Sequence, residues 1–188
     1  AETFSWKELF DKSTQAANMF RSLGINETDV VAYVLPNANE TLFSLLGGAI
    51  SGIVAPINPL LDTEQIAAIL RETAAKVVVT LKAFPKTDVC QKTAQAVALA
   101  PNVHTVLEVD LLRYLTPPKS WIVPLIRPKS NVQHSAKVIN FNQLLSQQSV
   151  TLDFEDIQED RAAALFHTGG TTGMPKVAQH KYSGLVYN

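Results

Sequence analysis

DVVAYVL, residues Asp29 to Leu35, is an uninterrupted apolar run that ends at Pro36. Three more apolar runs follow it: Ile53 to Asn58 (IVAPIN), Lys76 to Leu81 (KVVVTL) and a run near Val103 to Val109. Continuous Val, Ile and Leu runs are typical of parallel strands that are covered on both faces. The four runs therefore predict the centre of a mostly parallel sheet.

Helical patterns alternate with these runs. Ser5–Glu8 and Asp62–Gln65 have the form of capping boxes, whose side chains satisfy the free N–H groups at a helix start. Gly24 is expected to end the first helix, and Asn39 to cap a second one. A further helix is predicted from Thr87 to Ala100. The alternation predicts an α/β fold in which helices pack on a layered, mostly parallel sheet through right-handed crossovers.

The same periodicity identifies candidate core residues. Trp6 and Phe10, on the first helix, are expected to be buried. Cys90 is expected to be a small buried apolar residue and not a nucleophile. Gly48 and Gly52 lie in an apolar stretch that is too short for a membrane span, so they predict a tightly packed helix end that turns into a strand.

Composition limits the kind of protein. The chain has 188 residues, of which 46% are hydrophobic and 18% charged, as expected for a globular domain. Sixteen basic and 17 acidic residues argue against nucleic acid as a partner, and the spacing of His and Cys predicts no metal site. One cysteine excludes an internal disulfide, which favours a cytoplasmic location. Because the pattern stops in mid-course, we interpret residues 1–188 as an incomplete part of a larger protein, trimmed at both ends. The oligomeric state is left open.

Residues 111–152 break the alternation. The segment has no acidic residue and four of the ten prolines, and its basic residues are Arg113, Lys119, Arg127, Lys129 and Lys137. Prolines oppose a regular amphipathic helix, so we interpret the segment as an excursion packed on the domain surface. The less favoured alternative is a basic, aromatic surface at 113–137 that contacts anionic lipid or a partner.

A second informative stretch is Ala163 to Lys176, AALFHTGGTTGMPK, in which three of the eight glycines fall within five residues. An apolar strand leads into a loop of Gly and Thr that a lysine closes. Glycine lets the backbone approach a ligand, and successive N–H groups form an anion-binding nest. Threonine hydroxyls and the lysine add donors and positive charge. The residues predicted to bind a polyphosphate are Thr168, Gly169, Gly170, Thr171, Thr172, Gly173 and Lys176.

This loop differs from a Walker A loop, because Pro175 precedes the lysine and Val177 follows it. Lys176 is therefore expected to enter a strand, with a helix start after it, within a unit that spans 161–188. The clustered order of the loop favours phosphate binding over the alternative, a glycine-rich hairpin without a ligand. The residues leave open whether His167, beside the loop, contacts a phosphate or is only structural.

Thr168 to Lys176 resembles the phosphate loop of the adenylate-forming superfamily, particularly the acyl-CoA synthetases, at all but one position. Gly169 stands where Ser is usual in that loop. Tyr182 stands where many members have a His, so His180, which is out of register, is not given that role. Upstream, Leu35–Glu40 (LPNANE) is similar to the family's L-P-N-x-x-E segment. Gly52 to Leu61 (GIVAPINPLL) is similar to its G-x-V-x-x-P-x-N-P segment.

The resemblance implies part of the large N-terminal domain of an ATP-dependent acyl-CoA ligase. In such an enzyme a carboxylic acid, here expected to be a fatty acid, attacks Mg-ATP to give an acyl-adenylate and pyrophosphate, and coenzyme A then takes the acyl group. The loop would hold the β- and γ-phosphates. The family's adenine, ribose and catalytic-lysine motifs come after Asn188, so the 188 residues alone are expected to be inactive. The alternatives are an adenylation domain that serves a carrier protein and a non-catalytic nucleotide- or anion-binding module.

Overall fold

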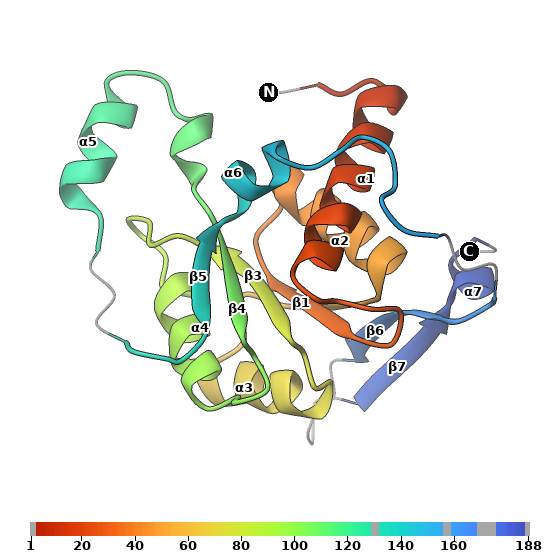
Figure 1. Ribbon diagram of the computed structural model, residues 1–188. Helices are drawn as coiled ribbons and strands as arrows, with labels where there is room; N and C mark the ends of the chain where they lie inside the picture. The colour runs from red at the N-terminus through yellow and green to blue at the C-terminus, as the bar shows by residue number, and fades with distance from the viewer. Residues whose placement is uncertain (1–2, 129–131, 156–158, 169–175, 187–188) are drawn as a thin grey trace.

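The computed structural model describes residues 3–128, 132–155, 159–168 and 176–186 (Figure 1). Within them seven strands form one sheet in the order β5-β4-β3-β1-β2-β6-β7. All neighbouring strands are parallel except the β6–β7 pair, which is antiparallel. The strands are β1 (Val30–Val34), β2 (Ile53–Ile57), β3 (Val77–Leu81), β4 (Thr105–Val109), β5 (Lys137–Asn140), β6 (Ala162–Thr168) and β7 (Lys176–Lys181). The mostly parallel α/β fold is thus confirmed.

Helices cover both faces of this sheet. Since β2 and β3 lie on opposite sides of β1, right-handed crossovers place α2 and α3 on opposite faces. Figure 1 shows α1 beside α2 on one side, and α3 beside α4 on the other. The helices are α1 (Trp6–Ser22), α2 (Asn39–Ser51), α3 (Thr63–Glu72), α4 (Val89–Ala98), the 3₁₀ helix η1 (Leu111–Tyr114), α5 (Lys119–Ile126), α6 (Phe141–Ser146) and α7 (Tyr182–Val186). No helix of the described ranges is both long and apolar enough to cross a membrane.

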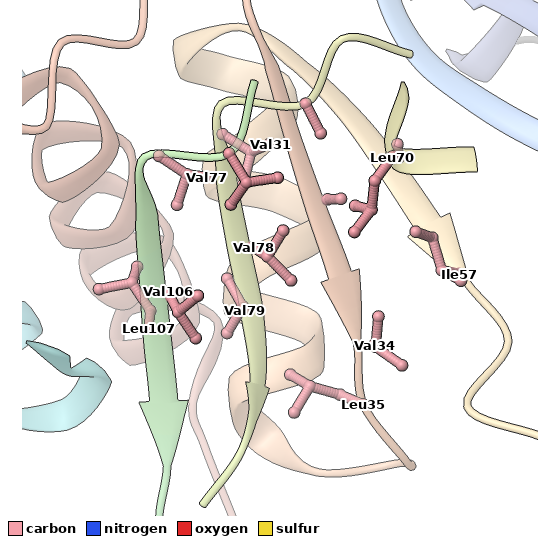
Figure 2. Close-up of a cluster of buried hydrophobic side chains, with 14 of the residues drawn as sticks. Val31, Val34, Leu35, Ile57, Leu70, Val77, Val78, Val79, Val106 and Leu107 are labelled. Carbon is pink, nitrogen blue, oxygen red and sulfur yellow. The ribbon is translucent and has the colours of Figure 1, made fainter. Parts of the chain in front are cut away.

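The core lies on the central strands, where the sequence predicted it. Val31 pairs with Val54 on one side and with Val77 on the other, and all three side chains are fully buried. All five residues of β3 are buried. Figure 2 shows this apolar layer continuing to Val106 and Leu107 of β4. Burial on both faces explains why these strands are continuous apolar runs and do not alternate with polar residues.

Local signals for helix ends were largely correct. The Ser5 hydroxyl accepts a hydrogen bond from the Glu8 N–H at 3.2 Å, and the Glu8 carboxylate accepts one from the Ser5 N–H at 2.7 Å. Asp62 and Gln65 form the same pair of bonds at 2.8 and 3.1 Å. Gly24 follows α1 with a φ of 85°, which favours glycine. Both capping boxes and the end of α1 are confirmed.

Other expectations about single residues were mixed. Asn39 is the first residue of α2 and not its cap; the cap is Ala38, which offers no side-chain hydrogen bond. Trp6 and Phe10 are 88% and 69% exposed, so their predicted burial is wrong. The part of α1 that is buried is its second half, which packs against α2. Cys90 is buried as expected, and burial together with Glu108 raises the pKa of its thiol to about 11, which disfavours a nucleophilic thiolate.

The predicted tight turn from α2 into β2 is confirmed. An added Cβ at Gly52 would lie 2.5 Å from the Asp29 carbonyl oxygen and 2.8 Å from that of Asn26. At Gly48 it would lie 3.1 Å from Val54. At Gly52 the backbone approaches backbone so closely that only a residue without a Cβ fits, whereas the approach at Gly48 is to a side chain and is less tight.

The segment 111–152 contains more regular structure than the sequence predicted. It includes η1, α5, the edge strand β5 and α6, although Pro124 lies inside α5. β5 pairs in parallel with β4, so the segment is a crossover that ends in the sheet. The α5 helix projects away from the sheet, at the upper left of Figure 1.

Candidate functional site

The β6–β7 hairpin positions the ends of the predicted phosphate loop. Thr168 and Lys176 are partners across the two strands, and Lys176 is the first residue of β7, which confirms that it enters a strand. The other predicted loop residues, Gly169, Gly170, Thr171, Thr172 and Gly173, lie outside the described residues. The structure therefore places the backbone at the two ends of the loop.

The end of β6 and the start of β7 lie at the carboxyl edge of the sheet. β6 runs parallel to β2, which runs parallel to β1, so all three end at the same edge. In open α/β sheets, ligands bind at this carboxyl edge. A pocket of about 350 Å³ lies along it; residues that line it include Tyr33, Leu35, Ile57, Asn58, Phe166 and His167. The loop ends thus lie where the fold favours ligand binding.

His167 has an unusual environment in this pocket. Neither ring nitrogen is reached by solvent, and neither has a hydrogen-bond partner in the described part of the chain. Burial lowers the pKa of His167 below its ordinary value, while Glu72 acts weakly in the opposite direction. A neutral imidazole can donate one hydrogen bond but adds no positive charge. His167 is therefore suited to orient a ligand and not to neutralise one.

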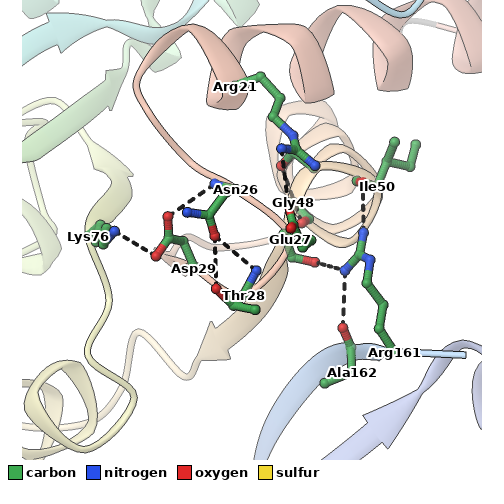
Figure 3. Close-up of polar contacts among 12 residues, drawn as sticks. Arg21, Asn26, Glu27, Thr28, Asp29, Gly48, Ile50, Lys76, Arg161 and Ala162 are labelled. Atoms are coloured by element: carbon green, nitrogen blue, oxygen red, sulfur yellow. Dashed lines mark hydrogen bonds and ion pairs between the residues drawn. The ribbon is translucent and has the colours of Figure 1, made fainter. Parts of the chain in front are cut away.

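The base of the hairpin is fixed to the end of α2 by Arg161, which directly precedes β6. Its guanidinium donates to the carbonyl oxygens of Ala49 at 3.0 Å, Ile50 at 2.9 Å and Gly52 at 2.6 Å. Figure 3 shows Arg161 reaching Ile50 and Ala162. These carbonyl groups have no partner within the helix, so a cation there satisfies them and suits the negative end of the helix dipole.

Tyr182, the first residue of α7 and directly after β7, completes this anchor. Its hydroxyl donates to the carbonyl oxygen of Ala49, and its ring lies 5.0 Å from the Arg161 guanidinium carbon. The Tyr182 side chain thus contacts the end of α2. His180 instead packs edge-to-face on Phe166, with ring centroids 5.2 Å apart. The loop therefore extends from a hairpin that is tied to the β1–α2–β2 unit.

A buried charge at the start of α2 makes a second connection. Glu40, the acidic residue of the LPNANE segment, has no exposed surface. Its carboxylate accepts hydrogen bonds from Arg113 at 2.6 Å, the Tyr114 hydroxyl at 2.7 Å and Asn142 at 3.0 Å. Burial and the bond to Glu40 raise the pKa of Tyr114. This network joins α2 to η1 and α6, as a buried carboxylate requires partners.

Comparison with known proteins shows which family has this sequence and fold. The sequence profile described as AMP-binding enzyme matches residues 1–188. The chain belongs to this family. This chain is 33% identical over 187 residues to the marinolic acid–CoA ligase of a Pseudoalteromonas strain, covering 100% of this chain and 26% of that protein. It is 27% identical to the long-chain-fatty-acid–CoA ligase of Bacillus subtilis, covering 98% and 33%.

The fold agrees with this membership. A solved structure of an acyl-CoA synthetase from Brucella canis superposes with a TM-score of 0.68 over 95% of this chain and 28% of that one, at 23% identity. The chain spans about a quarter to a third of the length of these relatives. The described residues are thus an N-terminal portion of the family's fold.

Two contributors to the site were not predicted from the sequence. Arg161 ends the charged run Glu159–Arg161 before an apolar strand, and nothing nearby in the sequence indicates that it binds the end of α2. Glu40 was noted as part of a family segment, but its partners Arg113, Tyr114 and Asn142 lie 73, 74 and 102 residues further along the chain.

Proposed function

We propose that this chain is the N-terminal part of an ATP-dependent ligase that activates a carboxylic acid as its adenylate and transfers it to coenzyme A. One observation carries the proposal: the TGGTTGMPK sequence begins and ends on paired residues, Thr168 and Lys176, of a hairpin that opens at the carboxyl edge of the sheet. Backbone N–H groups, hydroxyls and a lysine at this edge suit a polyphosphate.

The proposed reaction has two steps. A carboxylate oxygen attacks the α-phosphorus of ATP, the bond to the bridging oxygen breaks, and pyrophosphate leaves. The thiol of coenzyme A then attacks the acyl carbon, and AMP leaves. Residues 168–176 act in the first step by holding the β- and γ-phosphates and balancing the charge of the departing pyrophosphate. His167 can orient the loop or its ligand as a neutral donor.

Magnesium is expected to accompany the nucleotide. Among the described residues, His, Cys, Asp and Glu side chains do not gather in any group of three or more that could hold a metal ion. Mg²⁺ commonly keeps several waters and binds through substrate phosphates. The proposal therefore assigns no residue of this chain to the metal.

For the acid we propose a fatty or similarly apolar carboxylic acid, because the two relatives described above carry the names of marinolic acid and of long-chain fatty acids. Their names also specify coenzyme A as the acceptor, which favours it over a carrier protein.

ATP–pyrophosphate exchange by the intact protein, across a panel of carboxylic acids, tests the proposal. We expect exchange that depends on an apolar acid, followed by thioester formation when coenzyme A is added. Exchange without transfer to coenzyme A, but with transfer to a carrier protein, would favour an adenylation domain. ATP binding without exchange for any acid would identify a non-catalytic module. The 188-residue chain alone is expected to form no acyl-CoA.

A further inference from the structure

The α5 helix presents an apolar surface that the fold does not use. A helix between two parallel strands ordinarily buries its apolar side chains on the sheet. In α5 only Val123 is buried, whereas Trp121, Ile122, Leu125 and Ile126 are 71%, 47%, 85% and 58% exposed. Figure 1 shows α5 standing clear of the sheet. Four large apolar side chains on one short projecting helix form a concentrated exposed patch.

The helix is held firmly at this position. After its last turn, Arg127 donates to both carboxylate oxygens of Asp110, at 2.9 and 3.0 Å, and to the Ala83 carbonyl oxygen at 2.8 Å. Before its first turn, η1 is fixed through the contacts of Arg113 and Tyr114 with Glu40. The patch is therefore presented by a crossover that is anchored at both ends.

The charge around the patch indicates what it contacts. Residues 111–152 contain five basic residues and no acidic one. Two carboxylates that contact the crossover are paired with its arginines, Asp110 with Arg127 and Glu40 with Arg113. Lys119, the first residue of α5, is exposed and makes no ion pair within the described ranges. Lys119 thus places beside the patch a positive charge that is unpaired in the part of the chain that the structure describes, and no acidic residue of 111–152 offsets it.

We propose that α5 docks on an anionic lipid bilayer, with Trp121 and Leu125 inserted among the headgroups and Lys119 at the lipid phosphates. A Trp with aliphatic neighbours and a flanking lysine is typical of a helix that lies in the membrane interface. A protein partner would bury the apolar side chains equally well. The absence of acidic residues over the 42 positions of 111–152, however, specifically suits a negatively charged surface. The inference does not depend on the proposed ligase activity.

Vesicle binding of the intact protein tests this. Large unilamellar vesicles of phosphatidylcholine alone are compared with vesicles that contain about 30% phosphatidylglycerol, and bound protein is measured by co-sedimentation. Leu125→Ser is compared with Leu60→Ser, because these leucines are 85% and 86% exposed and Leu60 lies in the turn after β2. Circular dichroism is used to check that both variants remain folded.

We expect binding to the anionic vesicles that Leu125→Ser weakens about tenfold, Lys119→Gln weakens about fivefold, and Leu60→Ser leaves unchanged. Binding should also fall as salt is raised. The proposal is overturned if the protein ignores anionic vesicles, binds neutral ones equally well, or loses binding equally in the two leucine variants. Failure of Leu125→Cys to react with a thiol reagent in the folded intact protein also overturns it, because the rest of the chain would then cover α5.

Discussion

Gly47 on α2 lies directly against α1, and its replacement by alanine has a cost that the structure specifies. The new Cβ would lie 2.4 Å from the Cβ of Ala16, 2.9 Å from the Ala16 carbonyl carbon and 2.9 Å from the Ala17 nitrogen. Non-bonded carbon atoms ordinarily sit about 3.5–4.0 Å apart. Two of the three contacts are with backbone, so no side-chain rotation relieves them, and the helices must separate by about 1 Å.

Two opposing contributions set the size of the effect. Overpacking of this kind costs about 3 kcal/mol at the upper end of its usual range. Replacing glycine within a helix gains about 1 kcal/mol of intrinsic helix stability. Gly47→Ala should therefore destabilise the α1–α2 pair by about 2 kcal/mol. Gly48→Ala is the matched control, because its Cβ would meet side chains and no backbone, Val54 at 3.1 Å and Val31 at 3.7 Å, and its net effect should be close to zero.

Hydrogen exchange of the intact protein, followed by mass spectrometry, measures this locally. A loss of about 2 kcal/mol should speed exchange of α1 and α2 amides about 30-fold in Gly47→Ala, with little change in Gly48→Ala. Peptides from α3 and α4, on the other face of the sheet, should be less affected. Equal exchange in the two variants would refute the argument from close packing.

Three further predictions concern the anchors and the pocket. Arg161→Met should lower the free energy of unfolding by about 2–4 kcal/mol, against about 1 kcal/mol for Tyr182→Phe, in chemical denaturation; equal losses would contradict the assigned roles. Glu40→Ala should cost about 3 kcal/mol in the same assay, and Glu40→Gln clearly less, because the amide oxygen still accepts a bond. Burial lowers the pKa of His167, so the unfolded chain takes up the proton first and stability should fall as pH drops below about 6.5. His167→Phe should lose that part of the pH dependence, and an unchanged profile would argue against a buried neutral imidazole.

The sequence predicted features that depend on neighbouring residues. The capping boxes at Ser5 and Asp62 are local hydrogen-bonding units, and the central strands are apolar over their whole length. Lys176 at the start of a strand also followed from its neighbours, since Pro175 and Val177 oppose a helix.

Features that depend on distant contacts were not predictable in this way. Periodicity shows that α1 has an apolar face but does not show which half of the helix the fold covers, so Trp6 and Phe10 were misplaced. The α5 helix was missed because Pro124 opposes a helix. Contacts of Arg127 and of η1 with other parts of the fold nevertheless hold this short helix at its two ends. The role of Arg161 exists only once α2 and β6 are neighbours.

The central claim is that residues 168–176 bind the pyrophosphate side of ATP. Lys176→Ala in the intact protein tests it most directly when the two half-reactions are measured separately, with Lys181→Ala, an exposed lysine on the same strand, as control. Adenylation should slow by about 30- to 1000-fold, equivalent to about 2–4 kcal/mol, because a charge-assisted contact to the leaving phosphates is lost. Transfer from supplied acyl-adenylate to coenzyme A should be nearly unchanged, since pyrophosphate has already departed. If Lys176→Ala slows that transfer as severely as adenylation, the loop does not act on pyrophosphate and the assignment is wrong.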